Sequence, residues 1–381
     1  MTQRAGLYVH VPFCSSVCPY CDFAVLIAGP ERRAGFVPAL LAEAEQHASE
    51  GWSFDTLYLG GGTPSSLTVE QLEELIAGLR RRLPLAADAW ITLEANPDDV
   101  TRETAVAWRA LGIGTISLGL QSLDGDVLSL FGRRHSAAGA REAFDELRAS
   151  RVPSLSVDLI FGYPGHQPNA WRRQLNDLVS LTPDHVSCYQ LTVHEGTVFG
   201  HRRRRGELVE LTEDAQAALL ELTHLELTDA GYQAYEVSNF AVSQTHRSRH
   251  NQKYWGHVPY LGLGPSAHSF DGRRRWWNLR KVRLWQAAVG RNERPVEGLE
   301  ELSAVELALE AVMLGLRTSD GVDLEQVASR WGVDLAAANA ERLARLCAGG
   351  YVELNGTVVV PTLKGMAVAD ALARELEVPE M

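Results

Sequence analysis

Residues 11–23 read Val-Pro-Phe-Cys-Ser-Ser-Val-Cys-Pro-Tyr-Cys-Asp-Phe and place cysteines at positions 14, 18 and 21. The same spacing could form the buried stripe of a helix, but Pro12 and Pro19 disfavour a regular helix there. Zinc is a second alternative, although a closed structural zinc site needs four ligands and no cysteine or histidine follows at a finger-like distance. Thiolates gathered in a loop suit an iron–sulfur cluster, and three of them leave one iron of a cubane without a protein ligand. The pattern therefore predicts a [4Fe–4S] cluster with an open iron on these three cysteines.

The composition sets limits on the function. The 381 residues include 36 basic and 48 acidic side chains, a net charge of −12, which argues against a general nucleic-acid or anionic-membrane binder. No stretch approaches the roughly 18 apolar residues of a membrane helix, and the first residues have no signal-peptide pattern. Five cysteines are too few for a disulfide framework. We therefore expect a cytoplasmic protein without an integral membrane segment.

Apolar strand-like segments alternate with helical patterns along the first half of the chain. The expected strands are 6–11, 55–59, 90–94, 115–120, 154–160 and 185–191, and helices are expected near 68–82, 101–111 and 169–180, with a further helical stretch carrying 132–136. Such alternation predicts a parallel sheet with right-handed crossovers. Six units are too few for an eight-stranded barrel, so the predicted fold class is α/β with an open partial (β/α)6 TIM-like barrel.

Active sites of parallel barrels lie at the carboxyl ends of the strands. The three cysteines, the glycine run 60–62, Glu94, Gln121 and Asp158 all fall at or near such ends. Glycines let a backbone approach a ligand closely, although a tight turn would also explain them. A carboxylate that ends an apolar strand is costly without a partner. That partner is either a basic residue of a neighbouring helix or a ligand.

The cysteine spacing resembles the signature of the radical SAM superfamily, whose open iron binds S-adenosylmethionine (SAM). GGGTP at 60–64, EANPDD at 94–99, SLGLQS at 117–122, YEVSNFA at 235–241 and HNxxYW at 250–255 are together similar to the oxygen-independent coproporphyrinogen III oxidase-like family. The resemblance covers residue 6 to the C-terminus. It implies the radical SAM core fold and SAM contacts from these residues: Tyr8, Tyr20, Gly61, Gly62, Thr63, Glu94, Gln121, Arg133 and Asp158. Arg134 is an alternative to Arg133.

Two departures from the oxidase place the resemblance in the haem chaperone branch. Phe23 stands where the oxidase has a further cysteine, and the first strand begins near residue 6, whereas the oxidase carries an N-terminal extension. The branch implies a protein that binds haem and delivers it to an acceptor protein. The alternatives are oxidative decarboxylation of a porphyrinogen, or a radical SAM enzyme acting on another substrate. A smaller departure is Ser266, where a glycine is more usual, and it could alter the backbone dihedrals.

The resemblance also implies which residues bind haem. The HNxxYW segment is associated with haem in this branch, so His250, Tyr254 and His268 are the candidates. A neutral imidazole suits haem iron. His257 and His246 are rivals for the same role, and His250 could instead be a hydrogen-bonded structural histidine.

Three domains are expected, with boundaries at 1–200, 201–300 and 301–381. The last reads as helices at 303–315, 323–331 and 335–348 and a hairpin at 351–361, a winged-helix-like pattern. Residues 300–381 hold 6 basic and 14 acidic side chains, so nucleic acid is not the expected partner.

The run Arg202–Arg205 is expected to be a solvated loop, or else a patch that recognises carboxylates. Cys188 and Cys347 are expected to be buried and inert.

Overall fold

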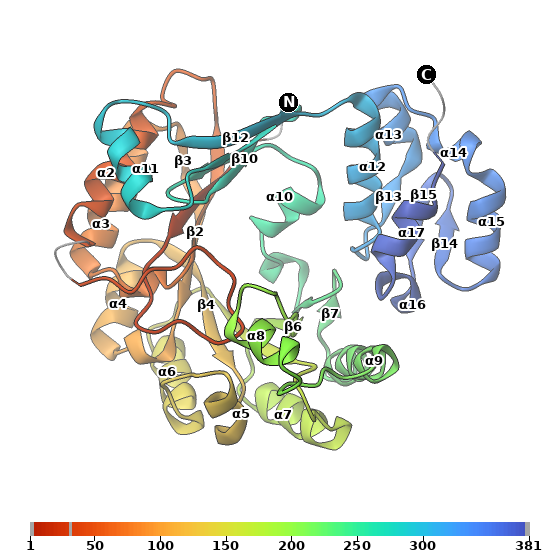
Figure 1. Cartoon of the computed structure of the whole chain (residues 1–381), viewed down its shortest axis with the longest axis horizontal. Coiled ribbons are helices and arrows are strands. Elements are labelled where there is room, and N and C mark those ends of the chain that lie inside the picture. The colour runs from red at the N-terminus through yellow and green to blue at the C-terminus, as the bar shows by residue number, and fades with distance from the viewer. Residues whose placement is uncertain (1–3, 30–32, 378–381) are drawn as a thin grey trace.

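The computed structural model describes residues 4–29 and 33–377 (Figure 1). Six parallel strands follow one another in chain order through the large sheet, and they confirm the six strands expected from the sequence. They are β1 (Ala5–Val11), β2 (Phe54–Gly61), β3 (Leu85–Ala95), β4 (Ile113–Gln121), β5 (Ser154–Phe161) and β6 (His185–Gln190). The connecting helices are α2 (Phe36–Glu45), α3 (Val69–Arg82), α4 (Arg102–Ala110), α5 (Gly125–Leu130), α6 (Ala137–Ala149) and α7 (Pro168–Ser180). Short 3-10 turns η1 (Pro64–Ser66) and η2 (Pro97–Asp99) follow β2 and β3.

The same sheet continues beyond both edges of the parallel core. Strand β9 (Tyr260–Leu263) pairs in parallel with β1, and β10 (His268–Phe270), β11 (Arg274–Asn278) and β12 (Val296–Glu301) follow antiparallel. At the other edge β8 (Asn239–Ala241) and β7 (Gln233–Ala234) pair next to β6. Within the described residues the large sheet thus has twelve strands. The part of the chain after β6 supplies the strands at both of its edges.

Strand alternation and register separate the apolar from the polar side chains of the core. Leu7, Leu57 and Ile116 are fully buried under the helices. The register pairs Tyr8 with Tyr58, and Gly119 with Asp158. Side chains two positions apart on a strand point to the same face, and so do the side chains of residues paired across neighbouring strands. Glu94 therefore lies on the same face of the sheet as these polar residues. Strand geometry alone therefore gathers the polar side chains on the face away from the helices.

Helices α8 (Val198–Arg204), α9 (Glu213–Asp229), α10 (Asn251–Trp255) and α11 (Val282–Gly290) belong to the segment after β6, as does η3 (Gln244–His246). The remaining elements gather beside the large sheet, drawn in blue in Figure 1. They are α12 (Ala304–Gly315), β13 (Val322–Asp323), α13 (Leu324–Trp331), α14 (Leu335–Ala338), α15 (Ala340–Ala348), β14 (Val352–Asn355), β15 (Val358–Pro361), α16 (Leu363–Met366) and α17 (Ala369–Glu375). This part has its own antiparallel sheet and its own apolar core. No helix in the described ranges is long and apolar enough to cross a membrane.

Three local expectations are wrong. Residues 132–136 form a turn, because Gly132 adopts a left-handed φ of 64° and the Arg133 amide bonds back to Leu128 and ends helix α5. The Arg202–Arg205 run is solvent-facing but lies at the end of helix α8, which the Thr197 hydroxyl caps. The helix expected over 335–348 breaks at Asn339, whose side chain bonds to Leu335 and Glu377.

Candidate functional site

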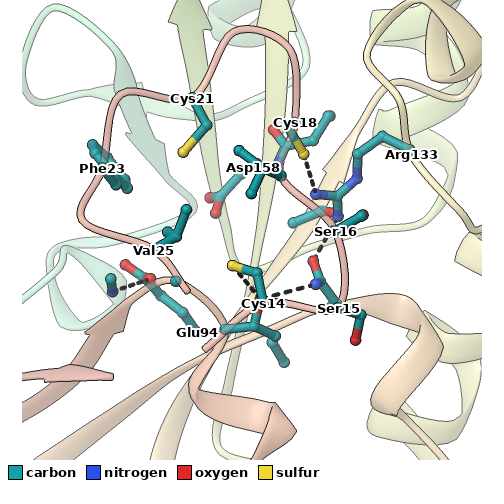
Figure 2. A pocket seen from close by; sticks show the side chains of 18 of the residues that line it. Cys14, Ser15, Ser16, Cys18, Cys21, Phe23, Val25, Glu94, Arg133 and Asp158 are labelled. Carbon is teal, nitrogen blue, oxygen red and sulfur yellow. Dashed lines mark hydrogen bonds between the residues drawn. The ribbon is translucent and has the colours of Figure 1, made fainter. Parts of the chain in front are cut away.

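The three cysteines lie on the loop that follows β1. The loop has no helical residues, so the cysteines are not a helix stripe. It is held at its base by two backbone hydrogen bonds, from Leu26 to Pro12 (2.7 Å) and from Cys14 to Leu26 (3.2 Å). All three thiols line one cavity of about 330 Å³ at the carboxyl ends of the strands (Figure 2).

The thiols are spread around the cavity. Within the described residues, no three histidine, cysteine or acidic side chains converge to hold a single ion, which disfavours the zinc alternative. In a cubane each thiolate binds a different iron, so separated thiols on one cavity fit a [4Fe–4S] cluster. Burial raises the pKa of Cys14, and it raises that of Cys21 to about 11, so these thiols need a metal to become thiolates near neutral pH.

A chain of hydrogen bonds joins two of the cysteines through the ends of four strands. The Cys14 Sγ lies 3.4 Å from the Thr63 hydroxyl, which accepts a hydrogen bond from the Asn96 amide (3.2 Å). Arg133 donates to Asn96 Oδ1 (2.6 Å) and to the Gly119 carbonyl (2.7 Å), and its other terminal nitrogen lies 3.8 Å from the Cys18 Sγ. These contacts tie the Cys14 and Cys18 thiols to the strand ends.

The glycine run lets β2 pass directly beneath the cysteine loop. A Cβ on Gly62 would lie 2.9 Å from backbone atoms of Pro12 and Phe13, and one on Gly61 would lie 2.5 Å from the His10 ring. Gly61 also has a φ of 112°, which other residues rarely adopt. Both positions thus require glycine for a physical reason. A tight turn alone would not require it at both.

Glu94 and Asp158 point into the same cavity (Figure 2). Glu94 accepts hydrogen bonds from the Tyr58 hydroxyl (2.8 Å) and the Gly61 amide (3.0 Å). Asp158 accepts one from the Ser117 hydroxyl (3.0 Å). Neither carboxylate pairs with a basic residue in the described part of the chain, so the salt-bridge alternative has no support.

Burial raises the pKa of Glu94 to about 7 and that of Asp158 to about 6. Both are therefore buried acids that a cationic or hydroxyl-bearing ligand would stabilise in the ionised form.

The other residues assigned to SAM divide into two groups. Tyr20, Thr63, Gln121 and Arg133 line the cavity, as does Arg134. Gln121 has a φ of 66°, a left-handed conformation that is uncommon outside glycine and is often found at functional sites. Tyr8 does not line this cavity. It faces a neighbouring cleft, and its hydroxyl lies 3.1 Å from His10 Nδ1.

The haem candidates lie around that second cleft. Tyr254 and His268 line it, and its volume is about 510 Å³. His250 is buried behind it, with Nδ1 3.0 Å from the Thr56 hydroxyl and Nε2 2.8 Å from the Tyr254 hydroxyl. Of the two rivals, His246 bonds to Ser154 and His257 bonds to Glu310.

Comparisons with known proteins agree with this geometry. The model of the radical SAM superfamily matches residues 8–178, and that of the HemN C-terminal domain matches residues 302–368. The heme chaperone HemW of Mycobacterium tuberculosis is 37% identical in an alignment that covers 98% of this chain and 95% of the relative. That of Bacillus subtilis is 30% identical, over 94% of this chain and 95% of the relative. The chain belongs to the HemW family of radical SAM proteins.

The fold is also that of a solved relative. The coproporphyrinogen III oxidase HemN from Escherichia coli superposes with a TM-score of 0.85 over 98% of this chain and 90% of the other, at 23% sequence identity. The α/β radical SAM core with its mixed, largely parallel sheet is therefore shared with HemN. Membership of the radical SAM family implies a [4Fe–4S] cluster and SAM, and the three thiols on one cavity suit both.

The sequence does not assign several residues that line this radical SAM cavity, among them Tyr58, Asn96, Ser117 and Tyr189. Asn96 lies inside the EANPDD motif, directly after β3, and its position at a strand end was a usable signal. Tyr58 and Ser117 are within strands, so only the register with Glu94 and Asp158 identifies them.

Proposed function

We propose that this protein is a haem chaperone, which binds haem together with a SAM-ligated [4Fe–4S] cluster and delivers the haem to an acceptor protein. The observation that carries the proposal is similarity over nearly the whole chain to proteins named heme chaperone HemW, at 30–37% identity. Similarity of that extent includes the segment after the parallel core, where the haem candidates lie.

Cys14, Cys18 and Cys21 would hold the cluster, which supplies an open iron for the methionyl group of SAM. Glu94 would pair with the SAM ammonium, because it is a buried carboxylate that already orients the Gly61 amide beside it. Asp158 would accept hydrogen bonds from the ribose hydroxyls. Gly62, Thr63, Gln121, Arg133 and Tyr20 would complete the contacts, and Tyr8 would act from the neighbouring cleft.

A second candidate function is the oxidase reaction, decarboxylation of porphyrinogen propionates. The shared fold with HemN is compatible with this reaction, but at 23% identity it shows only the fold. Phe23 argues against this reaction, because a phenyl ring stands where the coproporphyrinogen III oxidases have a further cysteine. Phe23 lines both the cluster cavity and the second cleft and is 62% exposed. A large apolar ring suits contact with a flat macrocycle better than it suits redox chemistry.

The finer features of the fold support a delivery role. We propose that β1–β6 form an open partial barrel over residues 1–200, that residues 201–300 supply the haem-binding extension, and that residues 301–381 form a winged-helix-like domain. Its excess of acidic side chains favours a protein partner over nucleic acid. The haem acceptor would then dock on or near this domain.

The experiment that tests the proposal combines reconstituted protein, haem, SAM, a reductant and coproporphyrinogen III without oxygen. The expected result is about one haem bound per chain and no protoporphyrinogen formed. Robust decarboxylation with an intact cluster would assign the protein to the oxidase reaction. Absence of haem binding would refute the chaperone function.

A further inference from the structure

The second cleft lies directly beside the cluster cavity. Phe23 and Gly61 line both spaces, and the floor of the cleft includes Tyr8 of β1 and Tyr260 of β9. Its volume of about 510 Å³ is within the 300–1,000 Å³ typical of cofactor and ligand sites. A ligand in this cleft would therefore sit next to the cluster without occupying the SAM cavity.

His268 is the histidine of this cleft whose ring is available. His10 also lines the cleft, but its Nδ1 faces the Tyr8 hydroxyl (3.1 Å) and its Nε2 faces the Ala24 carbonyl (2.9 Å). His250 is likewise engaged at both nitrogens. His268 is exposed, and its ring forms no hydrogen bond with any described residue. The ring stacks on Trp277, with centroids 5.9 Å apart and planes inclined by 24°, which holds its orientation.

Arg280 supplies the cation at the rim of the cleft. One terminal nitrogen donates to the Asp22 carbonyl (2.6 Å), and the side chain makes no other hydrogen bond within the described ranges. The remaining guanidinium donors are free to bind a carboxylate in the forked geometry that arginine favours. Asp22 also lines this rim, and its carboxylate lies 3.5 Å from the His194 ring.

We propose that haem binds in this second cleft, with His268 as an axial ligand, Arg280 bound to a propionate and the exposed Phe23 ring against the macrocycle. The inference rests on the proposed function and gives that function a location. It places the haem edge beside the cluster cavity, because Phe23 and Gly61 line both spaces. It also gives His250 a positioning role, because a hydrogen bond with the His250 ring holds Tyr254 in the cleft wall.

The first test replaces the proposed ligand. Haem is titrated into the reconstituted protein and into His268→Ala, with His201→Ala as the matched control because His201 is an exposed histidine outside the cleft. His268→Ala should lose the absorption spectrum of imidazole-ligated haem and bind haem about tenfold or more weakly. Added imidazole should restore the spectrum, whereas His201→Ala should behave like the unmodified protein. Iron and sulfide content and circular dichroism verify that cluster and fold are retained.

The second test addresses Arg280. Arg280→Gln should weaken binding of haem by about ten- to a hundredfold, because a charge-assisted hydrogen bond is lost. With haem dimethyl ester, which has no free carboxylate, the unmodified protein and Arg280→Gln should bind equally. Arg280→Lys should recover part of the affinity for haem.

Each outcome of these two tests either supports or overturns the proposed haem site. Unchanged spectra and affinities in both variants would overturn the location and leave the chaperone function standing. Loss of SAM binding in place of haem binding would overturn it too, since the cleft would then belong to the SAM site. If the unmodified protein bound no haem, the proposed function would fall together with this inference.

Discussion

Glu310 joins the C-terminal part of the chain to the large sheet. It lies on α12 and accepts two hydrogen bonds from the Arg275 guanidinium of β11 (2.8 and 2.7 Å) and one from His257 Nε2 (3.1 Å). Burial by itself would raise the pKa of the Glu310 carboxyl, but the hydrogen bonds from His257 and Arg275 outweigh it and lower the pKa from 4.5 to about 2. Glu310→Gln removes the charge and keeps the shape.

The pKa shift sets the size and the pH range of the effect. A fall from 4.5 to about 2 corresponds to roughly 3 kcal/mol, and we reduce this to about 1.5 kcal/mol because the carboxyl is only half-buried and is screened by solvent. Since the folded pKa lies below the unfolded one, the unfolded chain binds more protons at low pH. The stabilisation is therefore complete above about pH 4.5 and is lost as the pH falls toward 2.

The assay is urea unfolding followed by far-ultraviolet circular dichroism at pH 7 and at pH 3, with hydrogen exchange of the α12 peptides at pH 7 as a local readout. Glu353→Gln is the control, because Glu353 is exposed and forms no ion pair in the described residues. At pH 7 Glu310→Gln should be less stable than the control and should exchange faster in α12. At pH 3 most of the difference should be gone. A difference of undiminished size at pH 3 would show that packing, and not charge, explains it, and equal stability at pH 7 would refute the reasoning altogether.

Replacing all three cluster cysteines with Ala should abolish iron and sulfide binding without unfolding the protein, because the loop thiols are not part of the apolar core; retention of close to four irons would contradict the central assignment. Cys188→Ala should leave the iron content unchanged, since Cys188 is 1% exposed within β6, and loss of one iron would reveal a fourth protein ligand. Gly62→Ala should lower both cluster content and SAM binding, because the new Cβ would lie 2.9 Å from the backbone of the cysteine loop; normal reconstitution would show that the loop can move aside. Asp158→Ala should weaken SAM binding by about ten- to a hundredfold at constant cluster content, as measured by equilibrium dialysis, and an unchanged affinity would mean that Asp158 only positions Ser117.

The sequence predicts the parallel core because each strand can be recognised from its own residues and the turn that follows them. Each of the six strands is an apolar run followed by turn residues, and the polar residues that follow, such as Glu94 and Asp158, meet at one edge by geometry alone. The same reasoning could not find the partner of β9. Its four residues, Tyr-Leu-Gly-Leu, carry no sign that they pair with a strand some 250 positions earlier.

The other differences depend on contacts between residues that are distant in the sequence, or on local backbone conformation. Asn339 sits in a helical pattern, and only the folded chain shows that its amide bonds to Glu377 and breaks the helix. Ser266 was noted in the sequence as a substitute for glycine, and it does adopt a left-handed φ of 62°. Whether His250 is free or engaged depends on Thr56, a residue 194 positions away, so the sequence left both alternatives open.

The position of β1 in the sheet has a consequence for synthesis. β1 carries the cysteine loop at its end and pairs on one side with β2 and on the other with β9, which begins at residue 260. At translation rates of about 5–20 residues per second, β9 leaves the ribosome roughly ten to forty seconds after β2. During that interval the outer edge of β1 is an unpaired strand edge, the kind that recruits other chains. The newly made chain therefore depends on its surroundings to keep this edge apart from other chains until β9 has been made and pairs with it.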